Sequence, residues 1–283
     1  MPGDLHTHST FSDGSVKIER IPEMAHRAGL RALAVSDHDT LRSVAYAQAH
    51  PMQDGVELIP ATELSAFDYT RGRRVHLLAY WPEDTASLRS HCDRLAASRN
   101  EACLRSAQEL EAIYPQFSTE QALAWARDSG VLFKAGIMRA LCELGLADSI
   151  YGTVYHELFG SDPPGRVLHR PRYDPVDQVL ETMRASRAVV VLAHPSVYHS
   201  MELLRELAAA GRIDGIEADH PRNTPEDREE CLALAKQYHL IVTGGTDFHG
   251  SNSAHPRPVG TCTASDDAIE QLRALAQQYH QSK

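Results

Sequence analysis

Two short segments at opposite ends of the chain carry paired side chains that could bind a metal ion. Near the start, His6 and His8 lie two residues apart, and Asp13 follows within a few residues. In a β-strand, side chains at this spacing point to the same face, so both imidazoles can reach one ion, with Asp13 arriving from the loop that follows. Near the other end, Asp247 and His249 have the same spacing. We therefore predict that the two ends of the chain meet at a site for more than one ion.

Further histidines and acids lie at or near the ends of apolar segments between these two pairs. The segments cover residues 32–36, 56–60, 74–80 and 188–193, and their length and composition are typical of buried strands. In β/α barrels, the ends of such strands and the loops that follow them form the active site. Nine candidate ligands are too many for one ion and suit two or three. They are His6, His8, Asp13, His38, Glu63, His76, His194, Asp247 and His249.

The elements that must position these residues alternate between strands and helices. Helical spacing marks residues 17–28, 41–49, 175–186, 201–210, 225–238 and 266–280, and further strands are expected at 213–220 and before Gly244. Apolar strands that alternate with amphipathic helices are typical of a parallel sheet, and six or seven such units favour a closed barrel. The predicted fold is therefore an α/β barrel.

The middle of the chain has a different character. From about residue 81 to about residue 170 the sequence is charged, Ala- and Leu-rich and helical, notably at 88–110, 119–128 and 134–144. We interpret it as a helical subdomain inserted into the barrel. The expected division is a first barrel segment at 1–90, a helical insertion at 91–170 and a second barrel segment at 171–283.

Composition narrows the class of function. A chain of 283 residues with 42% hydrophobic content can bury a large core, and five widely spaced cysteines do not indicate disulfides. A net charge of −10 argues against binding of long nucleic acid, although small anions stay possible substrates. No positively charged leader and no run near the ~20 apolar residues of a membrane span is visible, so we expect a cytoplasmic protein. The sequence does not indicate the oligomeric state.

Taken together, the motifs resemble those of the PHP (polymerase and histidinol phosphatase) phosphoesterases of the amidohydrolase superfamily. The resemblance covers both barrel segments and includes His6-x-His8, Ser36-Asp37-His38-Asp39, Ala193-His194-Pro195 and Thr246-Asp247-Phe248-His249. It implies a distorted (β/α)7 barrel that holds three divalent ions at its C-terminal mouth. It also implies a ligand set for each ion: His6, His8, Glu63 and Asp247 for one, Glu63, His76 and His194 for a second, and Asp13, His38 and His249 for a third.

The resemblance implies hydrolysis of phosphoesters. Divalent ions can neutralise the phosphate oxygens and lower the pKa of a water that attacks phosphorus. Mixed imidazole and carboxylate ligands suit manganese, which we favour, and also iron or zinc. Asp247 or a neighbouring histidine could take the proton, and a histidine such as His194 could assist the leaving oxygen.

The insertion bears on the choice of substrate. Relatives with a similar insertion include a 3',5'-nucleotide bisphosphate phosphatase and a 5'-to-3' exoribonuclease, where an Arg-x-His is expected to hold a substrate phosphate. This chain has Lys134 and Gly136 at those places, and Arg99 and Ala102 where the family pattern has Arg-x-x-Arg. These departures favour a small phosphorylated metabolite, above all 5-phosphoribosyl 1,2-cyclic phosphate, hydrolysed at both ester bonds in turn. The nucleotide activities and another sugar or amino-alcohol phosphate are the alternatives.

The candidate substrate contacts are Lys134, Arg99 and His220. Each also has a plainer interpretation: a solvated helix start for Lys134, a surface position for Arg99 and a loop cap for His220. Two other classes of function are open. A PHP barrel can be a structural or proofreading module of a polymerase, and carbon–nitrogen amidohydrolases also begin with H-x-H. Those amidohydrolases usually bridge their ions with a carboxylated lysine, where this chain has Glu63.

Overall fold

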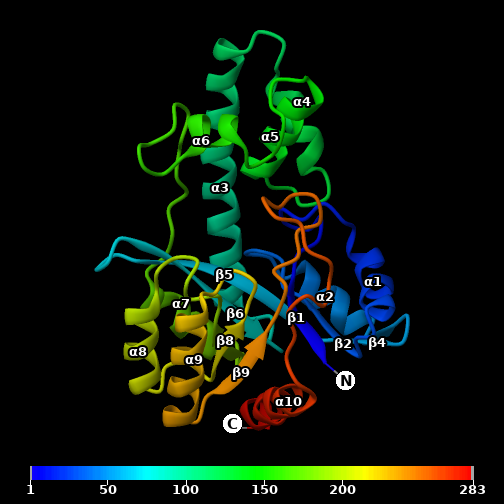
Figure 1. The fold of residues 1–283 in the computed structure, drawn as a ribbon, viewed down its shortest axis with the longest axis vertical. Helices are drawn as coiled ribbons and strands as arrows, with labels where there is room; N and C mark the ends of the chain where they lie inside the picture. Colours follow the sequence, from blue (N-terminus) through cyan, green and yellow to red (C-terminus); the bar gives the residue numbers. More distant parts are fainter. Residues whose placement is uncertain (1, 282–283) are drawn as a thin grey trace.

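The strands form two sheets that enclose a distorted barrel in the computed structural model, which describes residues 2–281 (Figure 1). The first sheet has the order β1-β2-β4-β3, and the second runs from β5 to β9 in chain order. The bounds are β1 Gly3–Thr7, β2 Ala32–Val35, β3 Met52–Gln53, β4 Val56–Leu58, β5 Ala61–Asp68, β6 Arg73–Tyr80, β7 Val189–Leu192, β8 Gly215–Asp219 and β9 Ile241–Gly244.

Isolated β-bridges join the two sheets and close the barrel. Thr7 pairs with Phe248, which brings the end of β1 beside the segment after β9, and His38 pairs with Glu63 at the other seam. Backbone hydrogen bonds reinforce the first seam, since the Asp247 N–H donates to the His6 carbonyl at 2.8 Å. The two ends of the chain therefore meet at one rim, as the sequence predicts.

The expectation of a wholly parallel sheet is wrong for β6 and for the short strand β3, which pairs antiparallel with β4. The reversal of β6 matters most for the site. This strand pairs antiparallel with both β5 and β7, while β1, β2, β7, β8 and β9 keep parallel neighbours. The reason is local: β5 and β6 are joined by a short hairpin with Gly72 at φ +65°, which leaves no room for a helical crossover. Because β6 is reversed, His76 near its start lies at the same rim as the ends of the other strands.

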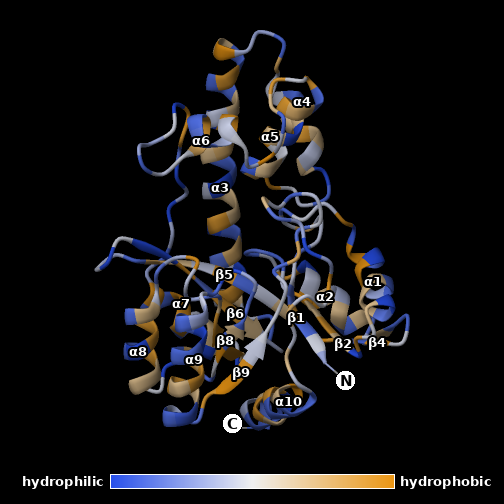
Figure 2. Cartoon of the chain, in the orientation of Figure 1, coloured by the Kyte–Doolittle hydropathy of each residue, from blue (hydrophilic) through white to orange (hydrophobic). Residues whose placement is uncertain are grey.

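Amphipathic helices cover the barrel, within a few residues of the predicted ranges. Their apolar faces pack on the strands, and Figure 2 shows hydrophobic residues concentrated on the inner strands while the surrounding helices carry both colours. The predicted helix at 17–28 begins as the 3₁₀ turn η1 at Ile18–Arg20. The covering helices are α1 Ile21–Arg27, α2 Arg42–Ala49, α7 Val176–Ala185, α8 Met201–Ala209, α9 Pro225–Tyr238 and α10 Asp266–Gln281.

The helical insertion stands above the barrel and is tied to it by one long helix (Figure 1). Near its start α3 packs Leu88 into the barrel core, and further along it packs Leu110 into a second apolar cluster formed by the insertion. The insertion comprises α3 Ala86–Ile113, α4 Thr119–Leu123, η2 Ala124–Ala126, α5 Lys134–Glu143 and α6 Thr153–Phe159. The sequence did not predict α6. The boundaries at residues 90 and 170 stay a prediction.

Among residues 2–281, none of the helices combines the length and apolar character needed to cross a bilayer.

Candidate metal centre

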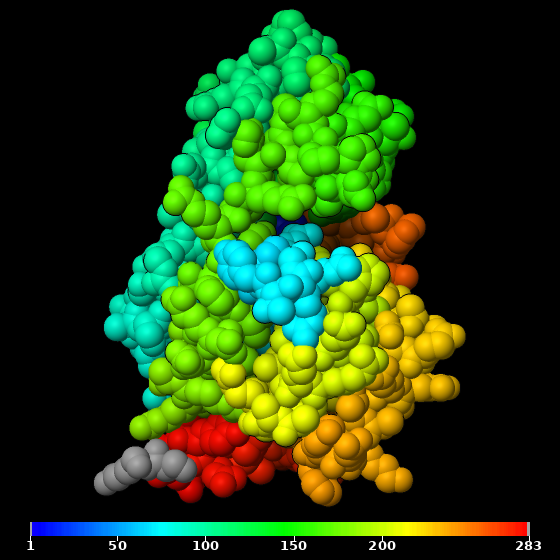
Figure 3. Space-filling model, turned by 90° about the vertical axis from the view of Figure 1, so that its left-hand side faces the viewer, coloured from blue at the N-terminus to red at the C-terminus, as the bar shows by residue number. Residues whose placement is uncertain are grey.

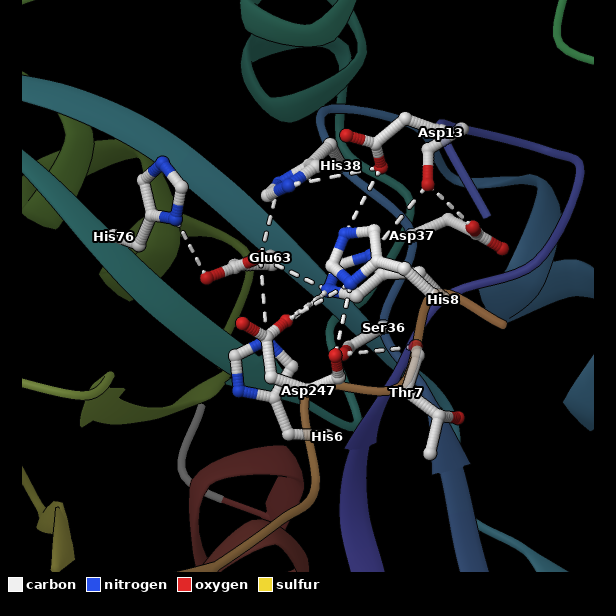
Figure 4. Close-up of polar contacts among 12 residues, drawn as sticks. His6, Thr7, His8, Asp13, Ser36, Asp37, His38, Glu63, His76 and Asp247 are labelled. Atoms are coloured by element: carbon white, nitrogen blue, oxygen red, sulfur yellow. Dashed lines mark hydrogen bonds and ion pairs between the residues drawn. The ribbon is translucent and has the colours of Figure 1, made fainter. Parts of the chain in front are cut away.

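Four side chains from three different parts of the chain converge at the barrel rim (Figure 4). The Nε2 atoms of His6 and His8 are 3.1 Å apart, and Glu63 Oε2 lies 3.3 Å from each of them. Asp247 Oδ1 lies 3.5 Å from the His6 nitrogen and 3.2 Å from the His8 nitrogen. Four ligands of one tetrahedral ion are about 3.3–3.6 Å from each other, so these atoms have the spacing of a ligand set.

The second oxygen of Glu63 faces a different pair of imidazoles. Its Oε1 atom lies 2.8 Å from His76 Nδ1 and 3.0 Å from His194 Nε2. Glu63 is completely buried, and its two oxygens therefore point into two adjoining groups of ligands. This is the position that a bridging carboxylate needs.

A third group lies toward the loop after β1. Asp13 Oδ1 is 3.2 Å from His249 Nε2 and 3.9 Å from His38 Nε2. His38 connects this group to the others, because its Nδ1 atom is 2.9 Å from Glu63 Oε2. The structure thus brings all nine predicted ligands into one cluster, and how they divide among individual ions stays a prediction.

The donor set fits divalent cations. Asp13 Oδ1 and Glu63 Oε2 are buried and accept no hydrogen bond from residues 2–281, although an unpaired buried carboxylate oxygen is costly. Imidazole and carboxylate together are the ligands of manganese, iron and zinc in proteins. A positive charge held between these groups would satisfy the oxygens that the protein leaves without donors.

The electrostatics of the cluster point the same way. Burial favours the neutral acid, but the nearby His76, His6 and His38 hold the pKa of Glu63 well below its usual range. Burial also opposes a charge on His8, yet the nearby carboxylates of Asp247 and Glu63 raise its pKa to about 10. The buried carboxylates thus stay ionised and demand positive charge beside them. Divalent cations would replace the protons of the imidazoles, so binding should release protons.

Comparison with known proteins identifies the family. The PHP domain model matches residues 4–129. The chain is 35% identical over 250 residues to the phosphoribosyl 1,2-cyclic phosphate 1,2-diphosphodiesterase of Eggerthella lenta, an alignment that covers 87% of this chain and 94% of that relative. The chain belongs to the PHP family of metal-dependent phosphoesterases. This confirms the resemblance and, with it, a hydrolase of phosphoric esters.

Other PHP proteins are similar over comparable lengths. The 5'-3' exoribonuclease Rnm of Escherichia coli is 29% identical over 255 residues, which covers 87% of this chain and 84% of the relative. A crystal structure from Bifidobacterium adolescentis, assigned to the metal-dependent phosphoesterases, superposes with a TM-score of 0.86 at 26% identity and covers 96% of both chains. The predicted α/β barrel with its insertion is therefore confirmed as a PHP fold.

One functional side chain in this PHP barrel escaped the sequence analysis. Glu217 on β8 is completely buried, and its Oε1 atom accepts a hydrogen bond from His6 Nδ1 at 2.9 Å. Its Oε2 atom accepts the backbone N–H of His194, also at 2.9 Å. Glu217 thus directs His6 Nε2 toward the cluster. In the sequence, Glu217 is one of several acids at residues 213–220, so nothing there singles it out.

Two buried aspartates place the loops that carry ligands. Asp37 accepts hydrogen bonds from the Ser9 backbone and hydroxyl and from the Ser12 hydroxyl, at 2.6–2.8 Å, and so shapes the turn before Asp13. Asp4 accepts the Thr246 N–H at 2.9 Å, which fixes the segment leading to Asp247. That segment also passes so close to β1 that a Cβ at residue 245 would lie 2.3 Å from His6 Cβ, so glycine is required there.

The three predicted substrate contacts have different surroundings. His220 is buried next to the cluster, with Nε2 3.5 Å from Asp247 Oδ2 and Nδ1 accepting the Arg222 N–H. Arg99 forms an ion pair with Asp39 and packs over Phe133, so its charge is already balanced. Lys134, at the start of α5, is half-buried over the Phe159 ring. Their contact with substrate stays a prediction.

Proposed function

We propose that this PHP enzyme hydrolyses 5-phosphoribosyl 1,2-cyclic phosphate to ribose 5-phosphate and inorganic phosphate, opening the ring and then removing the remaining ester. The observation that carries this choice is the similarity to the Eggerthella lenta diphosphodiesterase over 94% of that enzyme's length. The replacement of the expected Arg-x-His by Lys134 and Gly136 supports a substrate smaller than a nucleotide bisphosphate. We further propose a cytoplasmic enzyme that does not bind long nucleic acid.

We assign three divalent ions, with manganese favoured, to the cluster of nine ligands. Ions held there neutralise phosphate oxygens and lower the pKa of water. The ligand sets are His6, His8, Glu63 and Asp247 for the first ion, Glu63, His76 and His194 for the second, and Asp13, His38 and His249 for the third. Contacts within 4 Å occur inside each set, and His38 also lies 2.9 Å from Glu63, which links the third set to the other two.

Two side chains of the cluster can move protons. Asp247 has one oxygen beside His6 and His8, while its Oδ2 atom lies 3.5 Å from His220 Nε2 and can accept the proton of the attacking water. His194 has a buried Nδ1 atom without a hydrogen-bond partner in the described chain, and this N–H can serve the leaving oxygen. A fold in which both groups lie at one rim can treat the two ester bonds in succession.

The test is a direct comparison of substrates. Manganese-loaded protein is incubated with ribose 1,2-cyclic phosphate 5-phosphate and, separately, with adenosine 3',5'-bisphosphate, and the products are followed by phosphorus NMR. We expect the cyclic phosphate signal to be replaced by those of ribose 5-phosphate and inorganic phosphate. The Asp247→Asn variant should lose this turnover. Hydrolysis of the nucleotide alone would refute the proposed substrate and favour the activity of the exoribonuclease and phosphatase relatives.

A further inference from the structure

Three cations beside the cleft between barrel and insertion have no acidic partner. They are Arg74 on β6, Lys134 at the start of α5 and Arg170 in the segment that follows α6. Within residues 2–281, no carboxylate lies within ion-pair distance of any of them, and their neighbours include aromatic rings and a backbone oxygen. Arg71, on the same hairpin as Arg74, instead pairs with three carboxylates. The absence of acids is therefore a local property of the cleft wall.

Arg74 lies next to the metal centre. It precedes His76 by two residues in β6, so the two side chains point to the same face of the sheet. Its guanidinium carbon is 4.6 Å from the centre of the Tyr198 ring, and that ring lies edge-on to His76 at 4.8 Å and to His194 at 5.7 Å. A single aromatic ring thus separates Arg74 from two of the proposed ligands, a separation that one pentose can span.

The surroundings of Arg74 hold its guanidinium in place without neutralising it. The Tyr198 ring supports one face through a cation–π contact, and the Tyr173 side chain lies close to the guanidinium. The backbone of Tyr173 is in turn fixed to the hairpin, because its carbonyl accepts the Tyr69 hydroxyl at 2.9 Å. A planar guanidinium held in this way can offer two parallel N–H groups to a phosphate.

The charges of the group also act on one another. Burial and the nearby Arg74, Arg170 and Arg99 lower the pKa of Lys134 to about 8, which shows that the cations share one region. Figure 3 shows a hollow between the insertion above and the β5–β6 hairpin below, with residues of the N-terminal segment visible at its bottom. Arg74 belongs to this hairpin and Lys134 to the insertion, so both sides of the hollow carry a positive charge that attracts anions.

We infer that Arg74, supported by Tyr198, forms with Lys134 a subsite for the non-reacting phosphate of a substrate that carries two phosphoryl groups. This inference rests on the proposed function, in which that group is the 5-phosphate of the ribose and the cyclic phosphate lies at the ions. Binding of the distal phosphate would orient the sugar ring for both hydrolytic steps. It would also retain the intermediate monoester between them, since the 5-phosphate does not react.

The experiment compares two substrates that differ only in the distal phosphate. Values of kcat/KM are measured for ribose 1,2-cyclic phosphate with and without the 5-phosphate. We expect the wild type to prefer the 5-phosphorylated sugar, and Arg74→Met to reduce this preference by about tenfold to a hundredfold, the size of one charge-assisted contact. Arg74→Lys should keep part of the preference. Arg73→Met, an exposed neighbour on the opposite face, is the matched control and should keep all of it.

A second measurement separates this inference from the proposed function. If the wild type hydrolyses neither sugar, the proposed function fails, and the subsite is tested by calorimetry with inorganic phosphate on the metal-free full-length chain. Arg74→Met should then bind inorganic phosphate about tenfold more weakly than the wild type and Arg73→Met. An equal loss of kcat/KM for both sugars, or unchanged phosphate affinity in Arg74→Met, would overturn the subsite.

Discussion

The two walls of the cleft have opposite charge chemistry. At the barrel rim, buried acids and imidazoles contact one another, and oxygens of Asp13 and Glu63 lack hydrogen-bond donors. Beside this rim, on the β5–β6 hairpin and at the start of α5, Arg74 and Lys134 have no carboxylate within ion-pair distance among residues 2–281. The rim is suited to bind cations, and the group of Arg74 and Lys134 is suited to bind an anion. A phosphoester with a second phosphate satisfies both walls at once.

The two walls also differ in what holds them. The rim is fixed by backbone hydrogen bonds between strands and the loops after them, such as that from the Glu63 N–H to the Ser36 carbonyl at 3.0 Å. The cationic wall is assembled from a hairpin, the start of α5 and a loop, whose relative positions depend on α3 packing in both cores. We therefore expect substitutions at the rim to abolish hydrolysis, and substitutions of Arg74 or Lys134 to change substrate preference.

The largest effect is expected at the residue that the rim is built around. Glu63→Gln removes the charge that balances the surrounding imidazoles, and an amide presents only one oxygen to the two groups that Glu63 faces. Activity should fall at least about a thousandfold, roughly 4 kcal/mol of transition-state stabilisation, with loss of bound metal. Steady-state kinetics and elemental analysis measure both. Glu101→Gln, at a side chain on α3 that is 72% exposed, is the control. A Glu63→Gln enzyme with normal metal content would contradict a metal-binding role for Glu63.

A smaller change is expected for a ligand of one group only. Asp13→Ala should remove one ion while the barrel stays intact, because Asp13 contacts His249 and His38 but is not near His76. Elemental analysis should show one metal fewer per chain, and circular dichroism should match the wild type. Asp84→Ala, an exposed residue on the surface, controls for loss of an acid. An unchanged metal content would exclude Asp13 from the site.

The next effect concerns the orientation of a ligand. Glu217→Gln keeps the shape of the side chain but exchanges a carboxylate that accepts from His6 and from the His194 backbone for an amide. We expect metal affinity to fall about tenfold to a hundredfold. Competition with a chelator measures this, and added metal should restore most of the activity. If affinity is unchanged, Glu217 serves only the packing of the strands.

The sequence predicts the metal-binding rim far better than the cationic wall formed by Arg74 and Lys134. His6 and His8 are visible because strand periodicity places both on one face, and the helices were found because apolar residues recur at helical spacing. The direction of β6 was missed, since a strand buried on both faces has the same composition in parallel and antiparallel sheets. Glu217 was missed because Asp214 and Asp219 lie close to it in the sequence, and no spacing distinguishes it from them.

The cationic wall depends on contacts distant in sequence. Arg74 meets Tyr198 and Tyr173, which lie more than 90 residues further along the chain, so no local motif marks it. Arg99 is the converse case, where a matching family position is already paired with Asp39 in the fold. Recognition residues are thus set by how the insertion packs, whereas the ligands are set by where strands end.

The smallest effect is a pH dependence that distinguishes the two walls. Burial, Arg74, Arg170 and Arg99 lower the pKa of Lys134 to about 8, and Cys103 partly opposes them. Because a lysine is charged below its pKa, the subsite loses one cation as the pH rises through about 8. For the 5-phosphorylated substrate, kcat/KM should therefore fall above this pH, by about tenfold at most, since a lysine contributes a single point charge. Lys134→Arg keeps its charge, so its kcat/KM should not fall above this pH. The wild type should likewise show no such fall with the substrate that lacks the distal phosphate. If the fall persists in both cases, the titrating group belongs to the metal centre, and Lys134 is only a solvated start of α5.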